Sequence, residues 1–118
     1  MRASDAVGRY GERVAVAHLE QAGMVVLDRN WRCRHGELDV VALDGRCLVA
    51  VEVKTRRSTA FGHPVEAVTR AKLSRLRRLV AQWLADHDVR VDTVRIDVVA
   101  VMRPRSGPAL VDHRRAVA

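Results

Sequence analysis

The sequence predicts an α/β fold in which a mixed sheet is flanked by helices, and three observations carry this prediction. Two segments with helical periodicity, 5–22 and 65–87, are separated by strand-like segments. Two of these strand-like segments flank Asp44-Gly45, a dipeptide that favours a tight hairpin. A later segment, 94–101, has the near-continuous apolar run that is typical of a central strand.

The elements predicted along the chain follow one another without a linker. Ser4 suits the N-cap of the first helix, and Gly23 suits the residue that ends it. An antiparallel meander followed by a helical crossover gives the order αβββαβ, with a right-handed crossover. Strands are expected at 24–28, 36–43, 46–55 and 94–101, polar connections at 29–35, 56–64 and 104–108, and a further edge strand at 109–113.

Composition restricts the class of protein and its partners. A chain of 118 residues, 48% of them hydrophobic, is expected to form one domain, residues 1–118, whose tail frays from about residue 113. Its 21 Lys and Arg against 14 Asp and Glu favour a polyanionic partner, either nucleic acid or an anionic membrane surface. Two cysteines are too few for a disulfide framework. Without an apolar run of about 18 residues, we expect a cytoplasmic protein with no membrane span.

The first helix carries a face of small residues that includes one acid. At about 100° per residue, Gly8, Gly11, Ala15 and Leu19 share one arc, which is small enough to pack closely against a sheet. Glu12 lies within this arc. Either this glutamate turns to solvent, or it has a role beneath the helix.

The register of the predicted hairpin decides which acids become neighbours. A two-residue turn at 44–45 would place Asp39 opposite Ala50. In the same register Glu37 lies opposite Glu52. A longer loop of the same parity would slide the pairs along the strands without changing the face that each side chain occupies.

Three carboxylates and a lysine therefore share one face of the predicted sheet: Glu37, Asp39, Glu52 and Lys54. Burying Asp39 and Glu52 as neighbours without compensation would cost several kcal/mol. Lys54 and surface arginines could compensate them as a salt-bridge network. A divalent Mg²⁺ or Mn²⁺ ion, held by two carboxylates, a backbone carbonyl and water, would compensate them more completely.

The same arrangement suits hydrolysis of a phosphodiester. A lysine two residues after a ligand carboxylate can orient the attacking water or stabilise the negative charge that develops on phosphorus. No serine, cysteine or histidine is placed to act as a covalent nucleophile, and each of the five histidines is expected to be solvated.

Together these residues resemble the PD-(D/E)XK nuclease signature of the restriction-endonuclease-like fold. The resemblance is closer to the YraN-like family of small bacterial proteins, which are similar to archaeal Holliday-junction resolvases. It covers about residues 8–101. The matching positions are Gly8, Gly11 and Glu12, Arg29-Asn30, GELD at 36–39, VEVKTR at 51–56, Phe61-Gly62, Lys72, and Arg95 with Asp97.

This resemblance implies the site of a metal-dependent endonuclease. Asp39 and Glu52 would bind Mg²⁺ or Mn²⁺, with the backbone carbonyl of Val53 as a further ligand. Lys54 would be the catalytic lysine, and Glu12 would reach the site through water.

Two interpretations stay open for Glu37 and for Lys72, which lie near this site. Glu37, an extra acid, either supports the metal ligands or faces solvent. Lys72 lies on the apolar arc of the second helix, where it either extends outward to solvent or reaches the carboxylates or a phosphate. The resemblance favours the site. Arg95 and Asp97 are expected to form a structural ion pair. The predicted positive rim for nucleic acid comprises Arg56, Arg57, Arg70, Lys72 and Arg75.

The predicted function is metal-dependent cleavage of branched or structured DNA. The alternative is a nucleic-acid-binding module that keeps the nuclease fold without turnover. An RNA substrate is a third interpretation. Cutting two strands symmetrically requires two sites, so the resemblance to junction resolvases also implies a homodimer.

Overall fold

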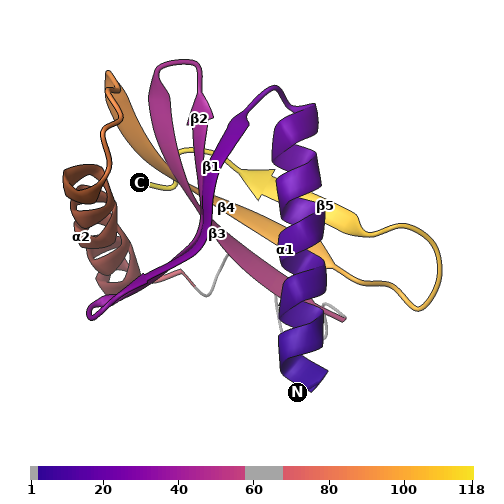
Figure 1. Ribbon diagram of the computed structural model, residues 1–118. Coiled ribbons are helices and arrows are strands. Elements are labelled where there is room, and N and C mark those ends of the chain that lie inside the picture. Colours follow the sequence, from indigo (N-terminus) through magenta and orange to yellow (C-terminus); the bar gives the residue numbers. More distant parts are fainter. Residues whose placement is uncertain (1–2, 58–67) are drawn as a thin grey trace.

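The computed structural model describes residues 3–57 and 68–118, and it confirms the predicted α/β fold with its αβββαβ order. The elements are α1 (Ala3–Gln21), β1 (Val25–Cys33), β2 (Gly36–Asp44), β3 (Cys47–Arg56), α2 (Arg70–Asp86), β4 (Thr93–Met102) and β5 (Leu110–Arg114). The strands form a mixed sheet in the order β1-β2-β3-β4-β5, in which only β3 and β4 run parallel (Figure 1). Phe61-Gly62 and most of the predicted 56–64 connection lie outside the described residues.

The two helices pack on opposite faces of the sheet (Figure 1). Ala15 and Leu19 of α1 are buried against a layer that includes Val49 of β3. Trp83 of α2 is buried against the other layer, which includes Leu48 of the same strand. Successive residues of β3 therefore serve two separate cores, as expected for a strand that is covered on both sides.

Helix α1 approaches β3 closely at Gly11. A Cβ atom at this position would collide with the side chain of Thr55, so the approach depends on glycine. Glu12, the next residue, is only 8% exposed. The small-residue face of the helix is thus confirmed as a packing face, and the interpretation of Glu12 as a solvated glutamate is wrong.

Strand β1 is longer than predicted, because most of the expected polar connection at 29–35 continues the strand. It pairs with β2 as far as Cys33 and Gly36, with a shift of register between Val26 and Asp28. Polar residues are accommodated here because β1 lies at an edge of the sheet, where one flank of the strand has no neighbouring strand.

The turn between β2 and β3 lies one residue later than predicted. Asp44 pairs with Cys47, so the turn residues are Gly45 and Arg46 instead of 44–45. Gly45 has a φ of 60°, which is the left-handed region that glycine enters without steric cost.

This displaced turn slides the hairpin pairs without exchanging the faces. Ala50 lies opposite Val41, so its predicted pairing with Asp39 is wrong. The pairing of β2 with β3 ends at Val40 and Val51, so Glu37 is not paired with Glu52 as predicted. Beyond this point Asp39 accepts a hydrogen bond from the N–H of Val53. Because the parity is unchanged, the acids still share one face.

The C-terminal segment is paired where we expected it to fray. β5 confirms the predicted edge strand and pairs with β4. Beyond it, the backbone N–H of Val117 donates to the carbonyl of Ile96 at 2.8 Å, and the N–H of Ile96 donates to the carbonyl of Ala118 at 2.8 Å. These bonds continue the edge of the sheet beyond residue 113.

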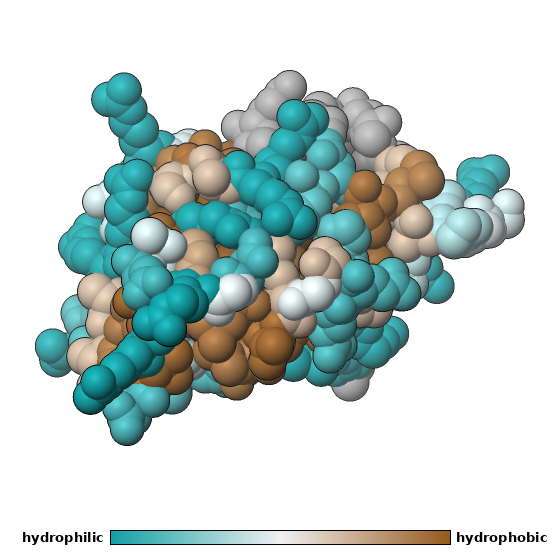
Figure 2. Space-filling view, turned by 90° about the horizontal axis from the view of Figure 1, so that it is seen from above, coloured by the Kyte–Doolittle hydropathy of each residue, from teal (hydrophilic) through white to brown (hydrophobic). Residues whose placement is uncertain are grey.

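Apolar side chains reach the surface in several places. Figure 2 shows hydrophobic areas bordered by hydrophilic ones on the upper face. Both edge strands contribute exposed apolar residues, and the large exposed hydrophobics are Val25, Leu27, Val94, Leu110 and Val111. Within the described ranges, no helix is long and apolar enough to cross a membrane.

Candidate functional site

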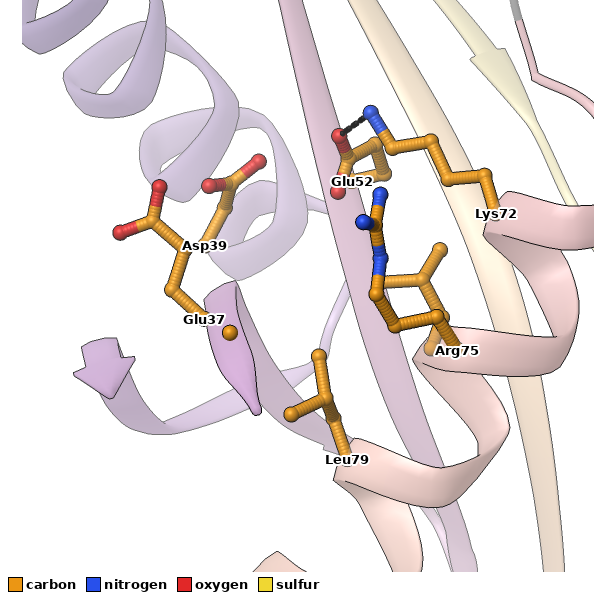
Figure 3. Close-up of a pocket in the computed structure, with 8 residues that line it drawn as sticks. Glu37, Asp39, Glu52, Lys72, Arg75 and Leu79 are labelled. Atoms are coloured by element: carbon orange, nitrogen blue, oxygen red, sulfur yellow. Dashed lines mark ion pairs between the residues drawn. The ribbon is translucent and has the colours of Figure 1, made fainter. Parts of the chain in front are cut away.

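Five of the predicted site residues line one hollow of about 260 Å³ between the sheet and α2. Figure 3 shows that the side chains come from three elements: β2, β3 and the part of α2 between Lys72 and Leu79. The charged residues that line the hollow are Glu37, Asp39, Glu52, Lys72 and Arg75. The fold thus brings together two acids from adjacent strands and two cations from a helix distant in sequence.

Asp39 is held in place by the backbone of the neighbouring strand. Its Oδ2 accepts a hydrogen bond of 2.8 Å from the N–H of Val53. Burial, with the negative charge of Glu52 as the next cause, raises the pKa of Asp39 to about 7 against the opposing effect of the Val53 bond. A cation bound beside this carboxylate would relieve both causes of the raised pKa.

Glu52 is the acid that the protein itself compensates. Its Oε1 lies 2.6 Å from Nζ of Lys72 and 3.4 Å from Nζ of Lys54. The Glu52 side chain is 10% exposed, whereas the two lysines are 23% and 22% exposed. Two ammonium groups from different elements therefore approach a single carboxylate oxygen.

The two lysines respond differently to this contact. Burial lowers the pKa of Lys54, and the neighbouring Lys72 lowers it further. Burial also acts to lower the pKa of Lys72, but its bonds to Glu52 and Lys54 outweigh that effect and raise it. Lys72 is therefore the main counter-charge of Glu52, and Lys54 is the lysine that gives up its proton more readily.

The donor set fits a hard divalent cation. In the described part of the chain, the second oxygen of each acid, Oδ1 of Asp39 and Oε2 of Glu52, has no hydrogen-bond or ion-pair partner. Carboxylate oxygens are the ligands that Mg²⁺ and Mn²⁺ prefer. Among the described residues, no group of three or more His, Cys, Asp or Glu side chains could hold a metal. An ion here would need backbone or water ligands as well, and the carbonyl of Val53 stays a predicted one.

Glu12 does not join this hollow. Its Oε1 accepts from Nε of Arg29 at 3.0 Å and from Nδ2 of Asn30 at 2.8 Å, and Nη2 of Arg29 lies 3.0 Å away. Asn30 adopts a φ of 52° within the strand. The motif Arg29-Asn30, to which the sequence assigned no role, thus supplies the partners of this buried acid.

The remaining predicted residues lie at the margin of the hollow or outside its lining. Glu37 pairs with Arg32 at 3.0 Å, and both side chains are well exposed, at 48% and 76%. Arg75 lines the hollow beside Lys72. The other members of the predicted positive rim, Arg56, Arg57 and Arg70, lie outside the lining.

Sequence reasoning missed a second buried acid cluster, although it placed one ion pair correctly. Asp97 is fully buried and bonds Nε of Arg95 at 3.0 Å, which confirms the predicted pair. His113 Nε2 lies 2.8 Å from the same carboxylate, and the N–H of Ala116 donates to it at 2.9 Å. Nδ1 of His113 lies 3.1 Å from Nε2 of His18. The prediction that every histidine is solvated is therefore wrong for His113, whose side chain is 7% exposed.

Comparison with known proteins identifies relatives along the whole chain. The model of "Uncharacterised protein family UPF0102" matches residues 11–101. A UPF0102 protein of Beutenbergia cavernae is 66% identical over 117 residues, which is 99% of each chain. One of Kineococcus radiotolerans is 65% identical over 114 residues, covering 96% of this chain and 93% of its own. A third, from Streptomyces coelicolor, is 53% identical over 120 residues, covering 100% and 92%.

Proposed function

The chain belongs to the protein family UPF0102, and we propose that it is a metal-dependent endonuclease that hydrolyses phosphodiester bonds in branched or structured DNA. The observation that carries this proposal is the pair of acids on adjacent strands. Asp39 and Glu52 are held in a hollow, each with one oxygen engaged by the protein and one without a described partner. The lysines compensate Glu52, whereas the described bonding partner of Asp39 is a backbone N–H, so the pair is fully compensated only when a further cation binds.

The residues around the acids have the properties that the chemistry requires. A bound Mg²⁺ or Mn²⁺ would polarise the phosphodiester and lower the pKa of a bound water. Asp39 and Glu52 would hold the ion. Lys54, whose pKa is lowered by burial, would orient the attacking water through its amine. Lys72 and Arg75 on the opposite wall would bind phosphate oxygens.

The charge of the chain supports DNA as the partner. The formal net charge is +7, and α2 carries three members of the predicted positive rim, Arg70, Lys72 and Arg75. Positive side chains bind the phosphate backbone without reading the base sequence. With aromatic residues at only 3% of the chain, a stacking platform for single-stranded bases is not supported. Recognition by backbone shape therefore fits the composition better than recognition of base sequence.

A cleavage assay with matched variants tests the proposal. Purified wild type, with Mg²⁺ or Mn²⁺, is incubated with labelled four-way junction, flap, nicked and single-stranded DNA. We expect cleavage of at least one branched substrate, and a loss of at least about a hundredfold in Asp39→Asn and Glu52→Gln. Asp92→Asn removes the same charge from an exposed pair with Arg46, and it should cleave as the wild type does. No cleavage by the wild type, or undiminished cleavage by Asp39→Asn, contradicts the proposal.

One observation favours a second function, a DNA-binding module without turnover. Two lysines already neutralise much of the charge on Glu52, so the cluster has a partial substitute for a metal. A module of this kind would bind junction DNA equally well with and without divalent ions. The DNA affinity of such a module would be unchanged in Asp39→Asn. In an endonuclease, the same variant should bind DNA more weakly in the presence of divalent ions or should fail to cleave it.

A further inference from the structure

Lys72 reaches Glu52 from a firmly placed turn of helix. The side chain of Thr69 caps α2 by accepting a hydrogen bond of 3.2 Å from the backbone N–H of Lys72. Leu76, one turn later, is 4% exposed and packs in the core beneath the helix. The backbone of Lys72 is therefore fixed on the wall of the hollow, and its flexible side chain spans the space to β3 (Figure 3).

The contact places a monovalent cation on an acid that a divalent one would also use. Nζ of Lys72 lies 2.6 Å from Oε1 of Glu52, closer than the 3.4 Å of Lys54. A nearly buried carboxylate requires a counter-charge, and in this structure Lys72 supplies most of it. Lys54 stands two residues along the same strand, whereas Lys72 belongs to a wall that also carries Arg75. Of the two lysines, Lys72 is the one placed to serve either Glu52 or a phosphate in the hollow.

We propose that Lys72 is an internal counter-ion of Glu52 that competes with the divalent cation until a DNA phosphate draws the ammonium away, so that metal and DNA bind cooperatively. This inference rests on the proposed function of the same hollow. Competition between two cations for one carboxylate weakens the binding of both. A phosphate that takes up the lysine removes the competition. By linkage, DNA then strengthens metal binding by the same factor by which metal strengthens DNA binding.

Metal affinity measured without and with DNA tests this inference. Mn²⁺ is titrated calorimetrically into wild type, Lys72→Met, Lys72→Arg and Arg78→Met, first alone and then with a four-way DNA junction that is checked to be intact afterwards. We expect Lys72→Met to bind Mn²⁺ about tenfold more tightly than wild type when DNA is absent. DNA should raise the affinity of the wild type but raise that of Lys72→Met much less.

The other two variants are matched controls for charge. Lys72→Arg keeps a cation at the same position and should keep the low affinity of the wild type. Arg78→Met removes one positive charge from an exposed position of the same helix outside the lining of the hollow, and it should change Mn²⁺ affinity by less than about threefold.

The outcomes separate this inference from the proposed function. If wild type binds Mn²⁺ but a folded Lys72→Met binds it no more tightly, Lys72 does not compete with metal and the inference is overturned while the metal site stands. If the gain on adding DNA is as large in Lys72→Met as in wild type, the coupling through Lys72 is overturned. If no protein binds Mn²⁺ with or without DNA, the proposed function fails and the inference fails with it.

Discussion

The acid cluster around Asp97 and the cluster formed by Asp39 and Glu52 differ in how completely the protein's own groups satisfy their carboxylates. Asp97 is fully buried, and its carboxylate bonds Arg95, His113 and a backbone N–H. Asp39 and Glu52 face one hollow, and each keeps one oxygen without a described partner. The first cluster is complete without a ligand. The second is left incomplete by the fold, which is what a site that binds a cation requires.

The two clusters also differ in how the free-energy cost of burying a carboxylate is compensated. At Asp97 the compensation is built from residues of β4, β5 and the segment that follows, so it forms as the chain folds. At Asp39 the pKa is raised because burial and Glu52 both disfavour the charged form. The first cluster should therefore stabilise the fold, while the second should cost stability and return it only when a cation binds.

The largest effect on stability is expected from removing Asp97, the centre of the complete cluster that it forms with Arg95, His113 and the N–H of Ala116. Asp97→Ala leaves Arg95 and His113 without their shared carboxylate in a nearly dry environment. We expect the free energy of unfolding to fall by about 3–5 kcal/mol, measured by urea denaturation. Asp92→Ala removes an acid whose pair with Arg46 is largely exposed, and it should cost less than about 1 kcal/mol. Equal costs for the two variants would show that Asp97 is no more important to the fold than a surface acid.

The sequence predicted the grouping of Asp39 with Glu52 better than it predicted the contacts of Asp97, for physical reasons. Faces follow from parity, so Asp39, Glu52 and Lys54 were placed on one side even though the turn lies at Gly45 and Arg46. The exact register could not be predicted, because several turns of equal parity suit the same strands. The partners of Asp97 could not be predicted from the sequence for another reason. His113 comes from a segment expected to fray, and no local pattern shows that the C-terminal residues pair with β4.

Neither family resemblance nor helical periodicity could predict the bonding partners of Glu12. Both placed this acid on the packing face of α1, but neither showed that Arg29 and Asn30 would bond it. Those contacts arise because the supposed polar connection continues as β1. A signal existed in the adjacent Arg29-Asn30 pair, two polar residues whose side chains had no assigned role. Long-range ion pairs of this kind depend on which edge strand passes which helix, and local patterns do not encode that.

The next effect is a gain in the free energy of unfolding, and it is expected from removing a charge from the incomplete cluster of Asp39 and Glu52. In metal-free protein, Asp39→Asn removes a carboxylate whose pKa is raised to about 7 from an ordinary value of 3.8. Because the unfolded chain loses this proton at lower pH, Asp39 costs the fold stability increasingly as the pH rises from about 4 to about 7. Above that range the full cost applies. The variant should be more stable than wild type by up to about 4 kcal/mol at pH 8.

Denaturation in a chelating buffer at several pH values measures this profile. The advantage of Asp39→Asn should vanish near pH 4 and should be reduced when Mn²⁺ is added to the wild type. A variant that is less stable than wild type at pH 8 would mean that Asp39 contributes to the fold as Asp97 does, and the contrast between the two clusters would be lost.

The smallest effect is expected at His18, which borders the complete cluster and responds to pH in the opposite direction. Beside an ionised Asp97, Nε2 of His113 donates to the carboxylate. Nδ1 of a neutral His113 then accepts from Nε2 of His18, whereas a protonated His113 places a positive charge next to His18. Burial lowers the pKa of His18, and the charges of His113 and Arg115 lower it further. The unfolded chain therefore takes up the proton first as the pH falls below about 6.5, and the fold loses stability in that range. His18→Gln keeps a donor without the titrating ring. It should match wild type at pH 8 and gain on it progressively between pH 6.5 and pH 5, in the same denaturation series. A constant difference across that range would show that His18 titrates as it does in the unfolded chain, and that the complete cluster ends at His113.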